Sequence, residues 1–214
     1  MNLGKPLIQY AQTDVSELKE KILQLPDSFW GIDKATRIKL ARGRPGNAVF
    51  FYNDVPSFVN KTSLSEARTG FVSVMRYSQR TLFQEVQQLI ESEILPVIPD
   101  CDVMRVQLAE LPPGQIIAPH KDVGILALIH RMHIPIITHH DVKFIIDNQL
   151  FVLEEGVLYD LNNAVMHSVV NKSLVNRFHL LVDLLPHSVA KARYFDDEEK
   201  MEKACLAFQN KVKN

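Results

Sequence analysis

Cysteine is scarce in this chain. Only two occur among the 214 residues, Cys101 and Cys205, and they are too few and too far apart in sequence to predict a disulfide scaffold. We therefore expect two free thiols in a reducing compartment, where cysteine acts as a small apolar side chain.

Long apolar runs and an excess of one charge are also missing. No run approaches the roughly 18 apolar residues that a membrane-spanning helix needs. The net charge of −1 gives no electrostatic case for nucleic acid or an anionic membrane surface as a partner. The first residues lack the apolar segment of a signal peptide. We therefore expect no nucleic-acid partner, no membrane association and a cytoplasmic location.

What the chain does contain is an ordinary globular composition, with 46% hydrophobic and 23% charged residues. This length is enough for one domain with a substantial core. The sequence character changes near residue 100. We expect one integrated domain with three segments: a helical and mixed region over 1–100 that buttresses the core, a β-rich core over 101–187 and a C-terminal helix over 188–214.

Two stretches before residue 100 carry apolar residues at helical spacing. Ser16–Leu25 has a short apolar stripe, and Gln79–Ile94 has a longer one that ends before Pro96. Between them, Ala48–Val59 is rich in β-branched and aromatic residues, which predicts a strand followed by a turn.

After Val103 the sequence becomes a series of short apolar runs separated by turn residues. Asp147-Asn148-Gln149 resembles a hairpin connection between two of them. About eight short strands in succession favour a mainly β protein built as a double sheet or barrel with flanking helices. The predicted strands are Val103–Leu111, Gln115–His120, Leu126–Ile137, Val142–Ile146, Leu150–Leu153, Val157–Leu161, His167–Val170 and Arg177–Leu185.

The last segment returns to helical spacing. Acidic residues 196–199 precede an apolar stripe, and lysines follow it, which complements a helix dipole. The segment is predicted to be one amphipathic helix packed on the barrel. A homodimer contact through this helix is an alternative with less support. The apolar positions are Met201, Cys205, Phe208 and Val212.

The candidate functional residues begin with His120 and Asp122. Residues at i and i+2 of a strand point to the same face, so both side chains are placed together where a strand meets a loop. His167 follows from a later strand. Two histidines and one carboxylate on one face, with open positions, form the site of non-haem Fe(II) oxygenases. The ordinary structural alternatives are a surface pair near a turn and a core histidine with satisfied hydrogen bonds.

Two arginines are predicted to face the barrel interior. Arg177 and His179 lie on one face of a predicted strand, and Arg131 and His133 lie on one face of another. A buried arginine needs an anionic partner, because an unpaired buried cation is costly. For Arg177 this partner is either a structural carboxylate, such as that of Asp183 or Asp160, or the carboxylate of a dicarboxylic co-substrate.

His139 and His140 are neighbours in sequence. On a strand they would face opposite sides, so they are not predicted to bind one metal together, and we expect them on the surface or the barrel rim.

Together these segments resemble the aspartyl/asparaginyl β-hydroxylase family of Fe(II)- and 2-oxoglutarate-dependent dioxygenases. The resemblance depends on the order, spacing and flanking residues of five segments between Leu108 and Pro186. They are LPPGQIIAPHKD (111–122), RMHIPI (131–136), EGVLYDLNN (155–163), HSVVN (167–171) and RFHLLVD (177–183).

The resemblance implies a double-stranded β-helix core, also called a jelly-roll or cupin-like core. It also implies that His120, Asp122 and His167 bind the iron and that Arg177 binds the distal carboxylate of 2-oxoglutarate. Arg131 and His133 match the Arg-x-His segment that helps to hold a co-substrate or substrate carboxylate. The membrane-anchored, protein-modifying members lack the metal-binding carboxylate. With Asp122 present, this chain looks more like bacterial members that hydroxylate a free amino acid, such as the proline hydroxylases.

The expected function is hydroxylation of an unactivated carbon in an amino acid or peptide-like substrate, with Fe(II), 2-oxoglutarate and O2, releasing succinate and CO2. One alternative is a cupin-like metalloenzyme of another reaction type. Such sites usually use three histidines, so Asp122 and Arg177 count against it. Another is a non-catalytic ligand-binding barrel, against which the complete ligand set argues.

Overall fold

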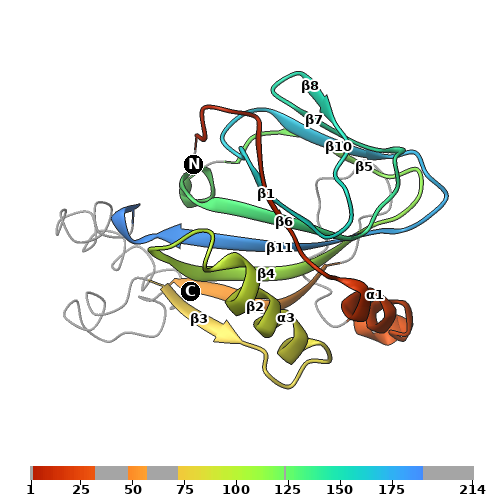
Figure 1. Cartoon of the computed structure of the whole chain (residues 1–214), viewed down its shortest axis with the longest axis horizontal. Coiled ribbons are helices and arrows are strands. Elements are labelled where there is room, and N and C mark those ends of the chain that lie inside the picture. The colour runs from red at the N-terminus through yellow and green to blue at the C-terminus, as the bar shows by residue number, and fades with distance from the viewer. Residues whose placement is uncertain (1, 32–47, 57–71, 123, 190–214) are drawn as a thin grey trace, which may run out of the picture.

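The fold consists of two antiparallel β-sheets that face each other, with helices covering the outer side of the larger sheet (Figure 1). The structure, a computed structural model, describes residues 2–31, 48–56, 72–122 and 124–189. In spatial order, the seven-stranded sheet contains β1 (Leu7–Gln12), β9 (Val157–Leu161), β6 (His130–Ile137), β11 (Arg177–Pro186), β4 (Cys101–Leu111), β2 (Ala48–Pro56) and β3 (Val72–Arg76).

The four-stranded sheet carries the other half of the barrel. Its spatial order is β5 (Ile116–His120), β10 (His167–Asn171), β7 (Val142–Ile146) and β8 (Gln149–Phe151). Strands that are neighbours in space are often distant in sequence, as expected for a jelly-roll. The described chain is therefore mainly β with a double-stranded β-helix core, as the sequence predicts.

Helical segments cover the outer face and the connections. Among the described residues, the α-helices are α1 (Ser16–Leu23) and α3 (Phe83–Leu89), and a π-helical turn, η4 (Ile90–Ile94), continues α3. The same part of the chain contains the 3₁₀ turns η1 (Asp27–Gly31) and η5 (Gly124–Leu128). Within the residues described, no helix is long and apolar enough to cross a membrane.

Strand alternation divides β11 between two environments. Phe178, Leu180 and Val182 belong to a buried apolar cluster that also contains side chains of α1 and α3. The intervening residues, Arg177 and His179, are buried on the opposite face, toward the smaller sheet. One face of the strand thus attaches the barrel to the helices, and the other places polar groups in the interior.

A second apolar cluster fills part of the space between the sheets. It contains Phe144 and Ile146 from the smaller sheet and Tyr159 and Leu161 from the larger one. Because α1 and α3 share the first cluster with the strands, the region before residue 100 packs on the core. The division of the chain into three segments stays a prediction.

Most of the predicted elements are confirmed, with small changes at their ends. The stripe in Gln79–Ile94 becomes helical only at Phe83, after Leu82 with φ 71°. The hairpin after β7 has two turn residues, Asp147 and Asn148, both with positive φ (49° and 60°), as a type I′ turn requires. The strands β1 and β3 were not predicted.

The prediction of one strand over Leu126–Ile137 is wrong in its first part. The structure has the 3₁₀ turn η5 there, and β6 begins at His130. Leu126 packs instead against a small buried cluster that contains Ile129. A continuous apolar run carries no alternation, so it does not distinguish a buried strand from a buried turn.

The predicted helix after residue 196 and Cys205 lie outside the described residues. Cys101 is a free, partly buried thiol. Burial and the nearby carboxylates of Asp102 and Asp100 raise the pKa of Cys101 to about 11. It is therefore a poor nucleophile at neutral pH, consistent with a structural role.

Candidate metal centre

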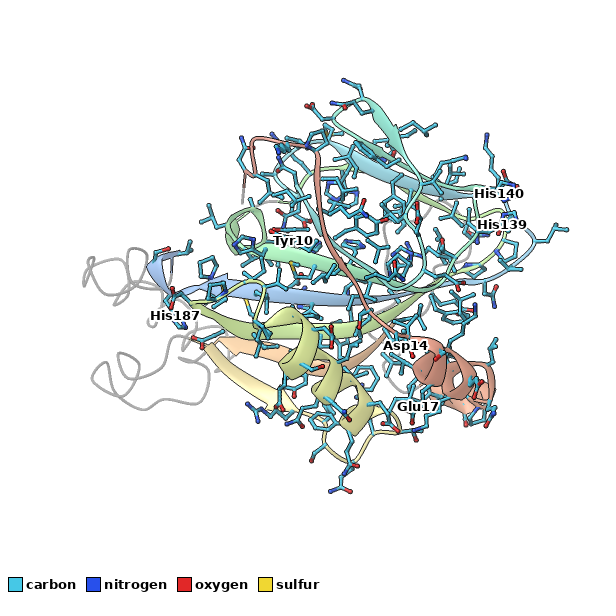
Figure 2. The ribbon with its side chains drawn as sticks, viewed as in Figure 1. Tyr10, Asp14, Glu17, His139, His140 and His187 are labelled. Carbon is cyan, nitrogen blue, oxygen red and sulfur yellow. The ribbon has the colours of Figure 1, made fainter. Side chains whose placement is uncertain are left out.

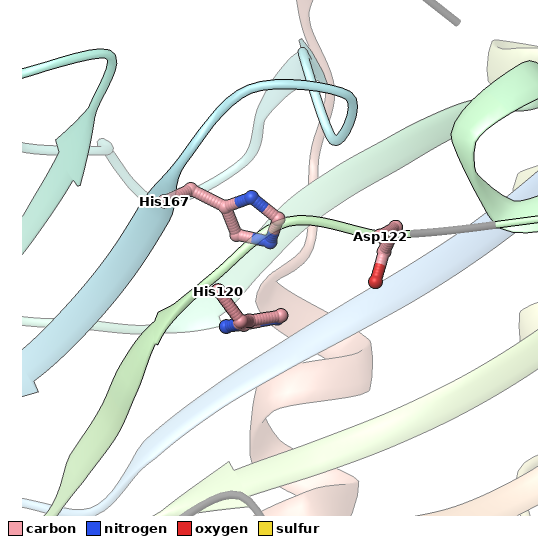
Figure 3. Close-up of side chains that lie close together, drawn as sticks. All are labelled: His120, Asp122 and His167. Carbon is pink, nitrogen blue, oxygen red and sulfur yellow. The ribbon is translucent and has the colours of Figure 1, made fainter.

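Three of the predicted ligands converge at one end of the smaller sheet. His120 ends β5, His167 begins β10, and these two residues are register partners across the strand pair. Their ring centroids are 4.2 Å apart. Asp122 follows two residues after β5, and the potential ligand atoms of the three side chains all lie within 4.8 Å of one another. Figure 3 shows the three side chains pointing toward a common space.

Hydrogen bonds to the backbone orient both imidazoles. Nδ1 of His120 lies 2.8 Å from the carbonyl oxygen of Ala118, and Nδ1 of His167 lies 3.0 Å from that of Val165. A carbonyl oxygen only accepts, so each Nδ1 carries the proton and each Nε2 carries a free lone pair. Burial lowers the pKa of His167 below its usual value, which favours the neutral, metal-binding form.

The loop that carries Asp122 is held at its backbone and at its side chain. The amide of Asp122 donates to the carbonyl oxygen of Asn163, at 2.9 Å. Its Oδ2 accepts a hydrogen bond from Nη1 of Arg131, at 2.5 Å. Arg131 of β6 therefore helps to place the carboxylate, in addition to the loop that carries Asp122.

Arg131 is also bonded on its other side. Its Nε and Nη2 donate to the two carboxylate oxygens of Asp183, at 2.8 and 3.0 Å. Although burial alone would lower it, Asp183 and Asp122 raise the pKa of Arg131 above its ordinary value. The structure thus explains this inward arginine by two carboxylates of the chain. A role of Arg131 toward a co-substrate or substrate carboxylate stays a prediction.

Arg177 has a different environment. Its side chain is 2% exposed, and its Nε has no hydrogen-bond partner. Among the described residues no carboxylate forms an ion pair with it, because Asp183 pairs with Arg131 and Asp160 lies 2.6 Å from Nδ1 of His130. Burial lowers the pKa of Arg177 to about 9. Neither structural carboxylate considered from the sequence is its partner.

Two neutral histidines lie beside Arg177 in the interior. Burial, Arg131 and Arg177 hold the pKa of His133 well below its usual value. Burial and Arg177 do the same for His179. Both imidazoles contact the ring of Phe144. This ring stacks on that of His179, with centroids 5.5 Å apart, and meets that of His133 edge-on, with centroids 6.1 Å apart. No hydrogen-bond partner of His133 Nδ1 or of either His179 nitrogen is found in the described part of the chain.

His179 shares the predicted strand face of Arg177, but it was not among the candidate site residues. The alternation of Arg177 and His179 with apolar residues was the available signal. The buried pair of His130 and Asp160 was missed altogether, and it lies on the outer face of the large sheet, where Asp160 pairs in register with Met132.

A second group of potential ligands lies at the other end of the barrel. His139, His140 and Asp141 have ligand atoms within 4.8 Å of one another. The prediction that the two histidines face opposite ways is wrong, because they follow the end of β6 in a turn and their ring centroids are 4.0 Å apart. Figure 2 shows both at the rim, as predicted. His140 is largely exposed, so this group lacks the enclosure of the first.

Comparison with known families agrees with this geometry. The family model described as aspartyl/asparaginyl beta-hydroxylase matches residues 71–186, which is more than half of the chain. The chain therefore belongs to the aspartyl/asparaginyl β-hydroxylase family, and it is an enzyme of the oxygenase/hydroxylase class. No curated protein sequence matches it significantly.

Several solved structures are similar to this chain, and the first of the following three supports the fold. An oxidoreductase of the 2OG-Fe(II) oxygenase family from Burkholderia pseudomallei aligns over 84% of this chain and 85% of its own, with a TM-score of 0.55 and 10% identity. A viral collagen prolyl hydroxylase from Paramecium Bursaria Chlorella virus-1 aligns over 86% and 97%, with a TM-score of 0.45 and 10% identity. A Pseudomonas putida prolyl-4-hydroxylase aligns over 85% and 92%, with a TM-score of 0.42 and 14% identity.

Proposed function

We propose that this protein is an Fe(II)- and 2-oxoglutarate-dependent hydroxylase in which His120, Asp122 and His167 hold the iron and Arg177 binds the distal carboxylate of 2-oxoglutarate. The observation that carries the proposal is the state of Arg177. It is a buried guanidinium without a carboxylate partner in the described chain, inside the barrel whose rim carries a three-ligand cluster.

The donor set fits iron. Both imidazoles offer Nε2, because their Nδ1 protons are used by backbone carbonyls, and Asp122 adds a carboxylate oxygen. Two nitrogens and one oxygen on one face of the metal suit Fe(II) and leave about three coordination positions for a bidentate co-substrate and O2. The carbonyl oxygens of Ala118 and Val165 fix the orientation of the two rings, which is common at metal-binding histidines.

The interior fits a dicarboxylate. The guanidinium of Arg177 lies with its Cζ 6.0 Å from the centroid of Phe144, and Phe144 is the register partner of Val169. Val169 is two residues along β10 from His167, or about 7 Å of strand. The five-carbon co-substrate is proposed to extend from the metal ligands toward Arg177 along this part of β10. Its carboxylate matches the planar guanidinium fork.

When bound, iron, 2-oxoglutarate and O2 supply the oxidation: one oxygen atom enters a substrate C–H bond, and the other enters succinate as CO2 is released. The chain contributes orientation and enclosure. Arg177 aligns the co-substrate, the backbone carbonyls of Ala118 and Val165 hold the imidazoles, and Phe144 excludes water beside the guanidinium.

The proposed substrate is an amino acid or an amino-acid-like molecule. Support comes from Asp122, which the membrane-anchored, protein-modifying members of the family lack and the bacterial free-amino-acid hydroxylases have. His133 lies next to Arg131 and Arg177. It is proposed to contact the co-substrate or substrate carboxylate, and Arg131 to help hold that carboxylate through its charge while its nitrogens stay bonded to Asp183 and Asp122. Cytoplasmic location and a homodimer remain part of this proposal.

The experiment is to measure succinate formation from 2-oxoglutarate with Fe(II), O2 and a panel of free amino acids. We expect turnover that rises with one or more substrates and disappears in His167→Ala. His187→Ala is the control, because this histidine is exposed and its imidazole lies 3.3 Å from Asp102, which is not one of the candidate ligands. Equal turnover in His167→Ala and the parent protein contradicts the proposal, as does the absence of Fe(II) binding in the parent protein.

A further inference from the structure

Three charged side chains from different segments form one continuous chain of contacts at the candidate metal centre. Asp183 on β11 accepts two hydrogen bonds from Arg131 on the adjacent strand β6, and Arg131 donates its remaining nitrogen, Nη1, to Oδ2 of Asp122. Asp183 is 2% exposed, so this arrangement is enclosed by the barrel. It holds the only carboxylate of the candidate ligand set.

We propose that Arg131 and Asp183 are positioning residues that reserve one oxygen of Asp122, so that Asp122 binds the metal through its other oxygen alone. The inference rests on the proposed iron site. Asp183 fixes the guanidinium plane by a two-point pair, and Arg131 in turn fixes the carboxylate of Asp122.

The number of coordination positions explains why one oxygen of Asp122 should stay off the metal. A carboxylate that binds through both oxygens takes two coordination positions of a six-coordinate metal. Two histidines and a one-oxygen carboxylate leave room for a bidentate co-substrate and O2, whereas a two-oxygen carboxylate leaves one position fewer. A strong, charge-assisted bond at 2.5 Å to Oδ2 competes with the second mode of binding.

The geometry separates this role from that of a simple anion anchor. The fork of Arg131 formed by Nε and Nη2 is occupied by Asp183, so an incoming carboxylate finds no free two-point edge there unless Asp183 leaves. Arg177 has no such pair in the described chain. The two interior arginines therefore have different tasks: Arg177 receives a ligand, and Arg131 orients a protein side chain.

The side chain of Asp122 can be released by substitution while the loop that carries it keeps a backbone hydrogen bond. The amide of Asp122 is bonded to Asn163 independently of Arg131. Substitution of Asp183 is therefore expected to release the side chain of Asp122 while its backbone stays in place. Asp160→Asn is the matched control: it also removes a fully buried carboxylate, one that lies 2.6 Å from Nδ1 of His130, but on the outer face of the same sheet.

The test is anaerobic titration with Co(II), followed by its visible absorption, in the parent protein, Asp183→Asn, Arg131→Lys and Asp160→Asn. In Asp183→Asn and Arg131→Lys we expect at least about a tenfold weaker Co(II) affinity and an altered absorption intensity, since loss of a residue that orients a metal ligand typically costs about 10- to 100-fold in metal affinity. Asp160→Asn should bind Co(II) as the parent protein does, even where its thermal midpoint falls.

A double variant keeps the result independent of folding. Arg131→Met/Asp183→Asn removes both charges of the buried pair, so its thermal midpoint should recover relative to Asp183→Asn, while Co(II) binding stays weak. Parent-like Co(II) affinity and spectrum in Asp183→Asn and Arg131→Lys overturn the inference and leave the iron site intact. Failure of the parent protein to bind Co(II) overturns the proposed function as well, so the two failures are distinguishable.

Discussion

The guanidinium of Arg177 lies beside the ring of Phe144, with Cζ 6.0 Å from the ring centroid, and makes no ion pair within the described chain. A cation–π contact contributes about 0.5–2 kcal/mol. Desolvation of an unpaired cation costs several kcal/mol. The contact with Phe144 therefore offsets only part of the desolvation cost of Arg177. An anionic ligand that forms an ion pair with Arg177 offsets the rest, which favours its binding.

Replacement of Arg177 by Met should weaken 2-oxoglutarate binding more than it affects folding. A hydrogen bond to a charged group contributes about 1.5–3 kcal/mol, which corresponds to about a 10- to 150-fold increase in dissociation constant. The thermal midpoint should stay unchanged or rise, because an unpaired buried cation is removed. The measurement is anaerobic titration of the Fe(II) protein with 2-oxoglutarate, followed by the visible absorption of the complex.

Arg177→Lys serves as the companion variant, since it retains the charge and loses the planar fork. Its affinity should fall between those of the parent protein and Arg177→Met. If both variants bind 2-oxoglutarate like the parent protein, Arg177 is not its anchor.

Acidic pH should destabilise the protein through His133 and His179. Burial holds the pKa of each well below its usual value, so below pH 6.5 the unfolded chain binds protons that the folded chain does not. The free energy of unfolding should therefore fall with decreasing pH, by up to about 1.4 kcal/mol per pH unit for each histidine. Above the pKa that these histidines have in the unfolded chain, their contribution to the free energy of unfolding no longer changes with pH.

The check is urea unfolding between pH 7 and pH 5 for the parent protein, His179→Leu and His187→Ala. The free energy of unfolding should change less steeply with pH in His179→Leu, which lacks one of the buried imidazoles. His187→Ala is the control for the substitution of a histidine as such, because His187 is exposed. Equal slopes in all three proteins would mean that His179 is not buried in its neutral form.

Leu180 tests the attachment of the barrel to its helices. Its side chain is fully buried in the apolar cluster that β11 shares with α1 and α3. Leu180→Ala should reduce the free energy of unfolding by about 2–5 kcal/mol. Leu174, which is 95% exposed, is the control, and Leu174→Ala should change it by less than about 0.5 kcal/mol. Chemical denaturation distinguishes the two, and similar losses would contradict the assignment of this core.

Gly156 tests the junction between β1 and the barrel. It has φ +74°, and a Cβ there would collide with the backbone oxygen of Thr13. Its carbonyl oxygen also accepts a hydrogen bond from the amide of Thr13, at 2.8 Å. Gly156→Ala should cost more than about 1 kcal/mol of stability, from backbone strain and displacement of Thr13.

Gly114 provides the comparison for Gly156. It has the same φ of +74°, but a Cβ there meets nothing within 4 Å. Gly114→Ala should therefore show the strain alone, and thermal unfolding of the two variants measures the difference. Equal losses would show that contact with Thr13 carries no cost.

Local patterns were sufficient for much of the fold. Alternation along β11 predicted that Arg177 and His179 share the interior face, because a strand has a period of two; that the other face packs on the helices is seen only in the structure. Alternation failed for 126–129, where a continuous apolar run is buried in a turn. It also missed β1, whose pairing with β9 depends on residues far along the chain.

The amino-acid sequence alone was enough to select His120, Asp122 and His167 and to mark Arg131 and Arg177 as interior cations, because residue type and strand spacing are local properties. Which cation has a carboxylate partner was decided by tertiary structure. Asp183 stands opposite Arg131 across β11 and β6, so that arginine is paired, whereas no described carboxylate reaches Arg177. Pairing of buried charges depends on distances between strands that are remote in sequence, and local spacing does not encode these distances.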